Sequence, residues 1–261
     1  MIKVDKDFYD IPKILKSSNR KEAFDKNILD SNYVDSKHRY KVGSVQKRLV
    51  EIYNLKCAYC EKSLLDAPKH IEHYRPKSIY YWLPYSWDNL LLCCGECNSS
   101  KGVKFPILNS MVQYKNETFE DINNLGNGYD KIEEPQIINP ERDDILHFIK
   151  FDRSGIMFSD EPRVDKTIMI CKLNRKELVQ RRLVILTDLS QEMDAHLLYF
   201  IAKKDTSRFI PTIQKFIEKL DTKNEFYAFR YFILNNTNIV SDNKFIIKIL
   251  DRILKKTIPN P

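Results

Sequence analysis

The sequence predicts an α-rich α+β protein, in which a small zinc-stapled core is flanked by helices on both sides. Two CxxC pairs, separated by 33 residues, have the spacing of a tetrahedral zinc site. Only six glycines occur in 261 residues, and apolar residues recur at helical spacing over long stretches, which favours helices. Two short segments between the cysteine pairs have strand character.

Changes in composition divide the chain into four parts. Residues 1–55 predict a helical N-terminal segment, and residues 56–104 hold both cysteine pairs. Residues 105–164 carry twelve acidic and six basic side chains and are punctuated by proline, so we expect an acidic, loop-rich insertion. Residues 165–261 are basic and predict a C-terminal helical region.

The first two parts predict a helix, two strands and a second, short helix. Ser44 can cap a helix that carries an apolar face and leads into the first cysteine pair. Residues 70–74 have strand character, and the strand should end near Pro76. Residues 88–93 predict the partner strand, and residues 98–101 begin the short helix.

The rest of the chain predicts one hairpin followed by helices. Residues 151–160 suggest a hairpin that turns at Ser154-Gly155. Asn174 with Glu177 resembles a capping arrangement for a helix with leucines at helical spacing. Further helices are expected near 207–220, 222–234 and 242–256, the last capped by Ser241.

The cysteines point to a structural zinc site in a reducing compartment. Four of the six fall in the two pairs, whereas a disulfide framework would scatter them more widely. We assign the ligands to Cys57, Cys60, Cys94 and Cys97. Cys93 is the alternative to Cys94, but only Cys94 keeps the CxxC spacing, so we interpret Cys93 as a buried strand residue.

Charge and hydropathy favour a cytoplasmic protein that meets nucleic acid. The net charge is +7, and basic ends flank the acidic insertion. Basic segments suit a phosphate backbone, although many lysines simply lie on solvated helix faces. The first residues are charged, and no stretch of eighteen apolar residues occurs, so we expect neither a signal peptide nor a membrane span.

Residues 57–102 resemble the HNH endonuclease family, whose ββα-metal core cuts nucleic acid with one divalent ion. The segments that carry the resemblance are CAYC, IEHYRPKS, WDNLLLC and CNSSK. The resemblance implies that His73 is the general base, that Glu72 and Asn98 bind a catalytic Mg²⁺ or Mn²⁺, and that Asn89 orients the imidazole. Lys101 completes a CNxxK pattern, and Lys101 or Arg75 would bind a substrate phosphate. Glu72 departs from the usual aspartate by one methylene.

Residues 40–185 further resemble the HNH subunit of bacterial Septu-type anti-phage systems, related to subunits that accompany some retrons. This resemblance implies an ABC- or SMC-like ATPase partner, with the C-terminal helices as its docking surface. DNA is the favoured substrate, and RNA such as tRNA is the alternative. A zinc module that binds nucleic acid or protein without catalysis is the other alternative, but it would need only the cysteines.

Several residues keep two interpretations. Glu72 and His73 are neighbours and would face opposite sides of a regular strand, so both reach one site only if the strand ends there. His70 shares a face with Glu72, but a surface histidine is the simpler interpretation. A second metal site at Asp143, Asp144 and His147 competes with a turn and helix start. Four aromatic residues suit either base stacking or packing: Tyr80, Tyr81, Trp82 and Tyr85.

Overall fold

The computed structural model describes residues 1–257 and the side chains of residues 1–254. The chain divides into two compact units. Unit 1 comprises Met1–Ile145 and Asp160–Leu173, and unit 2 comprises Leu146–Ser159 and Asn174–Pro261. Residues 1–55 and most of the acidic insertion therefore pack into one body with the cysteine-containing core.

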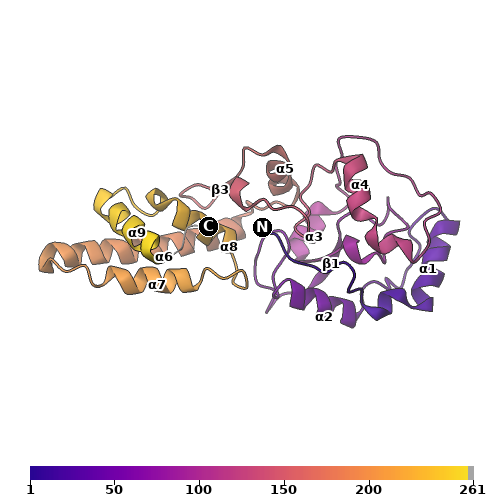
Figure 1. Cartoon of the computed structure of the whole chain (residues 1–261), viewed down its shortest axis with the longest axis horizontal. Helices are drawn as coiled ribbons and strands as arrows, with labels where there is room; N and C mark the ends of the chain where they lie inside the picture. Colours follow the sequence, from indigo (N-terminus) through magenta and orange to yellow (C-terminus); the bar gives the residue numbers. More distant parts are fainter. Residues whose placement is uncertain (258–261) are drawn as a thin grey trace. The chain divides into compact units, whose positions relative to one another are not determined.

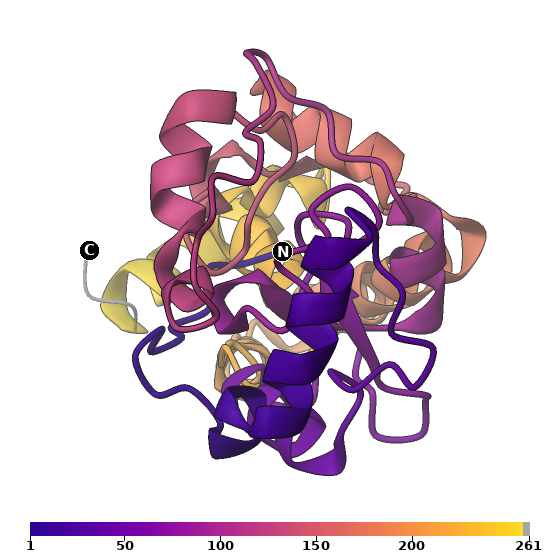
Figure 2. The same cartoon turned by 90° about the vertical axis from the view of Figure 1, so that its right-hand side faces the viewer.

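Unit 1 combines a small sheet with helices on its surface (Figure 1). Figure 2 views this unit from the side of α1, whose indigo ribbon crosses the front. Its elements, in chain order, are η1 (Lys13–Lys16), α1 (Ser18–Leu29), α2 (Gly43–Ile52), β1 (His70–His73), η2 (Trp87–Asn89), β2 (Leu90–Cys93), α3 (Gly95–Lys101), η3 (Asp121–Asn124), α4 (Gly126–Glu133) and α5 (Pro162–Ile170).

The sheet that carries the site is an antiparallel pair of strands, β1 and β2. His70 lies opposite Cys93 and His73 lies opposite Leu90. Every residue of β2 is buried, so this strand reads as a continuous apolar run rather than an alternation. Helix α2 packs against β2 and buries Val45 and Leu49 completely, as the apolar face of this helix predicts.

The second predicted strand is shorter than residues 88–93. Trp87–Asn89 form the 3-10 turn η2, and the ladder begins only at Leu90. The side chains of this turn explain the difference. Asp88 accepts from the backbone nitrogen of Gly126. Asn89 bonds to the backbone of Arg75 and of Leu83. Such side chain–backbone bonds compete with strand pairing.

A cation from the N-terminal segment fastens this turn to the rest of unit 1. The ammonium of Lys6 is buried and donates to the carbonyls of Trp87, at 2.6 Å, and Leu90, at 2.8 Å. It also pairs with the buried carboxylate of Glu141 at 3.1 Å. Segments 80 residues upstream and 50 residues downstream thus satisfy the polar groups at the start of β2.

Unit 2 consists of a short hairpin and helices. Its elements are η4 (Leu146–Phe148), β3 (Lys150–Phe151), β4 (Met157–Phe158), α6 (Lys176–Lys203), α7 (Phe209–Glu218), α8 (Tyr227–Asn235), η5 (Thr237–Ile239) and α9 (Lys244–Thr257). Helices α6, α7 and α9 pack on one another (Figure 1). The hairpin turns at Gly155, whose φ of 81° favours glycine. Residues 258–261 of the predicted C-terminal region lie outside the described residues.

Three predicted caps differ from the observed helix starts. Helix α2 begins at Gly43, and Ser44 makes no cap. Asn174 bonds instead to the backbone nitrogen and carbonyl of Met157, where it braces the hairpin. Ser241 accepts from the nitrogen of Asn243, and Asn243 in turn accepts from a nitrogen of α9. The helices themselves are present where the apolar spacing predicts them.

The helix-rich α+β class with a cysteine-stapled core is confirmed. No helix in the described part of the chain combines the length and the apolar character that a membrane span requires.

Candidate functional site

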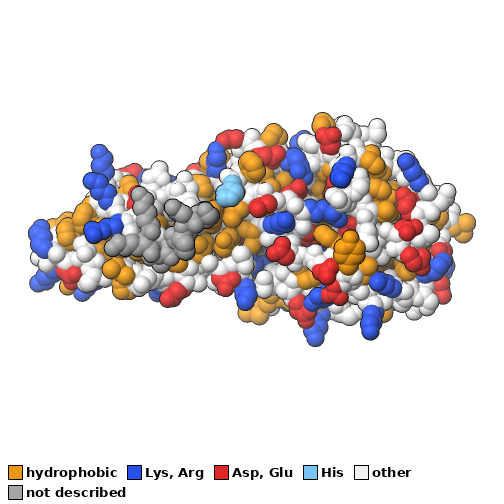
Figure 3. Space-filling view, in the orientation of Figure 1, with side chains coloured by type: hydrophobic (Ala, Val, Ile, Leu, Met, Phe, Trp, Pro, Cys, Tyr) orange, Lys and Arg blue, Asp and Glu red, His pale blue; other side chains and the backbone are white. Residues whose placement is uncertain are grey.

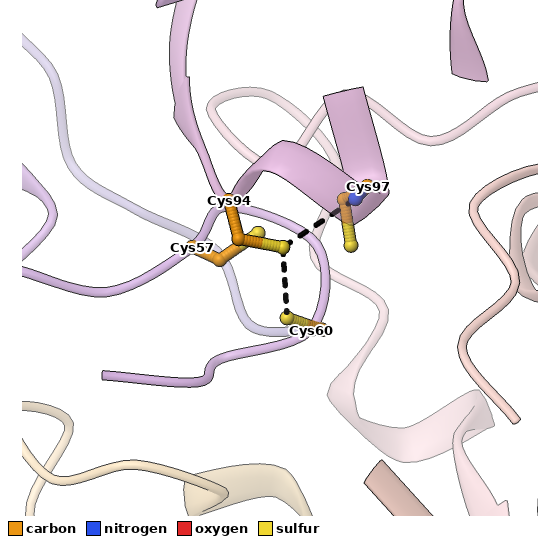
Figure 4. Close-up of side chains that lie close together, drawn as sticks. All are labelled: Cys57, Cys60, Cys94 and Cys97. Atoms are coloured by element: carbon orange, nitrogen blue, oxygen red, sulfur yellow. Dashed lines mark hydrogen bonds between the residues drawn. The ribbon is translucent and has the colours of Figure 1, made fainter. Parts of the chain in front are cut away.

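Four buried cysteines converge at the start of α3 (Figure 4). Their sulfur atoms all lie within 4.8 Å of one another, and the Sγ atoms of Cys60 and Cys94 are 3.8 Å apart. A tetrahedron with Zn–S bonds of about 2.3 Å has an edge of about 3.8 Å, so the donor set fits zinc. The predicted ligands Cys57, Cys60, Cys94 and Cys97 are therefore arranged as a zinc site.

Local structure explains why these four cysteines meet. Cys94 caps α3, and its sulfur accepts from the backbone nitrogen of Cys97 at 3.4 Å. The first pair sits on a loop that is tied to the sheet, because the nitrogen of Ala58 donates to the carbonyl of Leu92 at 2.8 Å. Cys93 is a buried β2 residue outside the cluster, which confirms the choice of Cys94.

Glu72 lies on β1 and is held by Lys101 of α3. The ammonium of Lys101 donates to Oε1 of Glu72 at 2.8 Å, and both side chains are buried. Burial raises the pKa of Glu72, and the neighbouring ammonium opposes that rise. Among residues 1–254, Oε2 of Glu72 receives no hydrogen bond, so one carboxylate oxygen is left as a donor for a metal ion.

His73 ends β1, as the argument from strand alternation requires. Its Nε2 lies 3.1 Å from the carbonyl oxygen of Pro84. A carbonyl only accepts, so Nε2 carries the proton and Nδ1 keeps the basic lone pair. Burial lowers the pKa of His73 to about 3, and the ammonium of Lys77 contributes to this shift. The imidazole is therefore neutral near pH 7.

Asn89 fixes the loop that contacts this imidazole. Its Oδ1 accepts from the backbone nitrogen of Arg75 at 2.7 Å, and its Nδ2 donates to the carbonyls of Arg75, at 3.1 Å, and Leu83, at 3.2 Å. Leu83 directly precedes Pro84, whose carbonyl contacts His73. The amide thus braces the loop whose Pro84 carbonyl contacts the imidazole.

Asn98 lies on the face of α3 that meets β1. It precedes Lys101 by three residues, and residues three apart share one face of a helix. Because Lys101 reaches Glu72, the side chain of Asn98 starts from the same side. Asn98 is partly exposed, and among residues 1–254 its side-chain amide makes no hydrogen bond. Its amide oxygen is therefore available as a metal ligand.

Arg75 and Lys101, the predicted phosphate ligands, are both buried and bonded within the protein. Arg75 is 2% exposed, and its guanidinium bonds to Glu133 at 2.8 Å and to Asp130 at 2.7 Å, both on α4. Lys101 is fully buried, and besides Glu72 it binds the carbonyl of His73 at 2.7 Å. The geometry gives their predicted phosphate contact no support, because protein oxygen atoms already surround both cations.

Most of the remaining candidate residues are buried or bonded within the protein. Asp143 bonds to Arg163 and to the backbone nitrogen of Asn139, as a turn residue does. The acids 143 and 144 and His147 form no metal-binding cluster within the described chain. Tyr80, Trp82 and Tyr85 are buried, with polar atoms bonded to Glu133, Tyr129 and Asp35, respectively. His70 is partly buried beside the start of α3.

Two residues beside His73 escaped the sequence analysis. Tyr40 presents its ring edge-on to the imidazole, with centroids 4.4 Å apart. Lys77 lies close enough to influence both His73 and Glu72 electrostatically. Lys77 lies in the IEHYRPKS segment shortly after His73, so the sequence could have indicated that it lies near the site. Tyr40 lies in an upstream loop with no recognisable sequence pattern.

Known proteins match the same region. The sequence model of the family described as HNH endonuclease matches residues 57–104. Septu protein PtuB of Bacillus mycoides (strain KBAB4) is 33% identical over 167 residues, which cover 58% of this chain and 53% of that protein. Septu protein PtuB of Bacillus thuringiensis is 33% identical over 115 residues, or 42% of each chain.

Septu protein PtuA of Bacillus mycoides (strain KBAB4) is 22% identical over 227 residues, covering 82% of this chain and 30% of that protein. The chain spans about half the length, or less, of the curated relatives that it matches. The matched family region coincides with the zinc-type cysteine cluster, β1, β2 and α3. Residues 57–104 therefore form an HNH endonuclease domain, in a chain that is homologous to Septu protein PtuB.

Proposed function

We propose that this chain is a metal-dependent endonuclease that hydrolyses phosphodiester bonds in nucleic acid, with DNA as the favoured substrate. The observation that carries the proposal is the state of His73. Its Nε2 is bonded to the carbonyl of Pro84 at 3.1 Å, which places the proton of the neutral ring on Nε2 and leaves the lone pair on Nδ1. A neutral imidazole held in one tautomer beside a carboxylate is suited to act as a general base.

The chain's own residues would divide the work as follows. Nδ1 of His73 takes a proton from the attacking water. Oε2 of Glu72 and Oδ1 of Asn98 are the protein ligands of Mg²⁺ or Mn²⁺, since hard ions prefer oxygen donors. The ion, when bound, supplies positive charge beside the scissile phosphate and the leaving 3′ oxygen. Lys101 holds Glu72 in place, and Asn89 holds the loop that fixes the imidazole.

A cleavage assay tests this proposal. Zinc-loaded wild type is incubated with supercoiled plasmid and with total tRNA, with Mg²⁺, with Mn²⁺ or with a chelator. We expect metal-dependent cutting that falls by a factor on the order of 10³ in His73→Ala. His147→Ala is the matched control, because this exposed histidine belongs to unit 2. The substrate that is cut decides between DNA and RNA.

The proposal fails if His73→Ala cuts at the wild-type rate. It also fails if neither the chain nor its complex with an ATPase subunit cuts any substrate while binding remains. That second outcome would favour a zinc module that binds nucleic acid without catalysis.

We further propose that the chain is the nuclease component of an anti-phage complex with an ABC- or SMC-like ATPase. Similarity to Septu proteins supports this role. Unit 2 offers a docking surface, because α6 and α7 expose Leu198, Ile201 and Ile210, each by 47% or more. We expect Ile210→Asp to abolish co-purification with the ATPase. Leu65→Asp, which alters an equally apolar exposed residue in unit 1, should have no effect.

A further inference from the structure

The loop between α1 and α2, residues 30–42, forms a wall beside the imidazole of His73. Tyr40 of this loop is 3% exposed and packs edge-on against His73 at 4.4 Å. His38 and Tyr33 continue the aromatic surface outward, since the hydroxyl of Tyr33 lies 2.9 Å from Nδ1 of His38. An aromatic surface thus leads from solvent to the general base.

Buried polar groups hold this loop in one conformation. The carboxylate of Asp35 is 5% exposed and accepts from the backbone nitrogen of Arg39, at 2.7 Å, and from the hydroxyl of Tyr85, at 2.7 Å. Asn27 of α1 accepts from the nitrogen of Val34, and Arg20 donates to the carbonyl of Arg39. A loop fixed at both ends and in its middle is preorganised for contact with a ligand.

Two lysines cover this wall. The ammonium of Lys77 lies 4.9 Å from the ring centroid of Tyr33 and 6.0 Å from that of Tyr40. The ammonium of Lys41 lies 5.8 Å from the ring centroid of Tyr40. Lys77 follows β1 and lies within a turn in which the carbonyl of Pro76 accepts from the nitrogens of Ile79 and Tyr80. Its backbone is therefore placed by the strand that carries the catalytic pair.

Within the described residues these two cations form no close ion pair with a carboxylate, although the charge of Glu72 acts on Lys77. Among residues 1–254, neither Lys77 nor Lys41 has an acidic oxygen within ion-pair distance. Each lowers the pKa of His73. Burial lowers the pKa of Lys77, the carboxylate of Glu72 opposes that shift, and the ammonium of Lys41 adds to it. Two like charges near one another on an aromatic surface are stabilised by an anion that contacts both.

On the face visible in Figure 3, basic and acidic side chains are interspersed. Arg75, which follows β1, and Lys101, which contacts Glu72, are buried and bonded to protein oxygen atoms. Lys77, by contrast, is partly exposed, and Lys41 is exposed. A ligand can therefore reach both cations.

We propose that Lys77, Lys41 and the aromatic wall of the α1–α2 loop bind the backbone phosphates of the nucleic acid beside the scissile bond. This inference rests on the proposed nuclease function and assigns the phosphate contacts to residues outside the CNxxK motif: Lys41 at the end of the α1–α2 loop and Lys77 in the turn after β1. Tyr40 is a positioning residue for the imidazole, and Tyr33 offers a ring on which an unpaired base stacks.

Binding measurements separate this inference from catalysis. The probe is a short fluorescent DNA duplex, with a single-stranded RNA of the same length as a second probe. Affinity is measured by anisotropy over a series of salt concentrations in the His73→Ala background, so that no cleavage interferes. The variants are Lys77→Gln and Lys41→Gln. Lys26→Gln, an exposed lysine of α1, is the control.

We expect each test variant to weaken binding and to reduce the slope of log affinity against log salt by about 0.9 on the duplex or about 0.7 on the single strand. Lys26→Gln should leave both unchanged. Slopes in Lys77→Gln and Lys41→Gln that equal the control would overturn the inference, as would the absence of binding to either probe. If these slopes fall but neither the wild-type chain nor its complex with an ATPase subunit cuts any substrate, the phosphate site stands and the nuclease proposal fails.

Discussion

Lys101 joins the two residues on which the site depends: its ammonium lies 2.8 Å from Oε1 of Glu72 and 2.7 Å from the carbonyl oxygen of His73. This contact crosses from α3 to β1 and is completely buried. The lysine of the CNxxK pattern therefore holds the helix against the strand, which sets the positions of Glu72 and Asn98 at the same time.

Replacing Lys101 tests this structural role. Lys101→Met leaves a buried carboxylate without its cation, and we expect the free energy of unfolding to fall by about 3 kcal/mol. Urea denaturation of the zinc-loaded protein measures the change. Lys104→Met is the control, because the ammonium of Lys104 donates to the carbonyl of Ser100 at the surface. The double variant with Glu72→Gln should recover part of the loss, and strictly additive losses would argue against the coupling.

Replacing Arg75 tests whether this cation stabilises the fold or binds the substrate. Its guanidinium bonds two carboxylates of α4, so Arg75→Ala removes the cation that pairs with the buried Glu133, whereas Asp130 keeps its pair with Arg142. We expect a loss of roughly 3–5 kcal/mol in unfolding free energy. A folded Arg75→Ala protein of normal stability with a raised KM would instead restore the phosphate-binding role.

The zinc content of cysteine variants should depend on whether the replaced cysteine belongs to the four-cysteine cluster. Wild type should hold about one zinc per chain by elemental analysis. We expect Cys97→Ser to lose zinc and, with it, the anchoring of α3. Cys93→Ala should retain zinc, because Cys93 lies outside the cluster although it neighbours a ligand. Loss of zinc from Cys93→Ala with retention in Cys94→Ala would reverse the ligand assignment.

Asn89 should affect turnover more than substrate binding. Asn89→Ala removes the bonds that join Arg75 to Leu83, so the Pro84 carbonyl and the His73 ring are no longer held in register. We expect kcat to fall on the order of 10²-fold with a small change in KM. Circular dichroism and zinc content serve as controls for folding. A wild-type kcat would show that the loop needs no such brace.

The sequence by itself determined the parts of this protein whose signals are local. Two CxxC pairs specify a four-thiolate zinc site through spacing alone, and apolar periodicity located the helices. The Glu72-His73 pair, the two asparagines and the turn at Gly155 were likewise recognisable as short patterns.

Only the tertiary structure decided which partners each polar group has, because those partners come from distant segments. Lys6 and Glu141 meet the start of β2, and α4 provides the carboxylates that hold Arg75. Burial makes such pairing obligatory, yet nothing near Arg75 or Lys101 in the sequence reveals it. The accessible cations and the ring that packs on His73 depend on how the α1–α2 loop folds back onto the sheet.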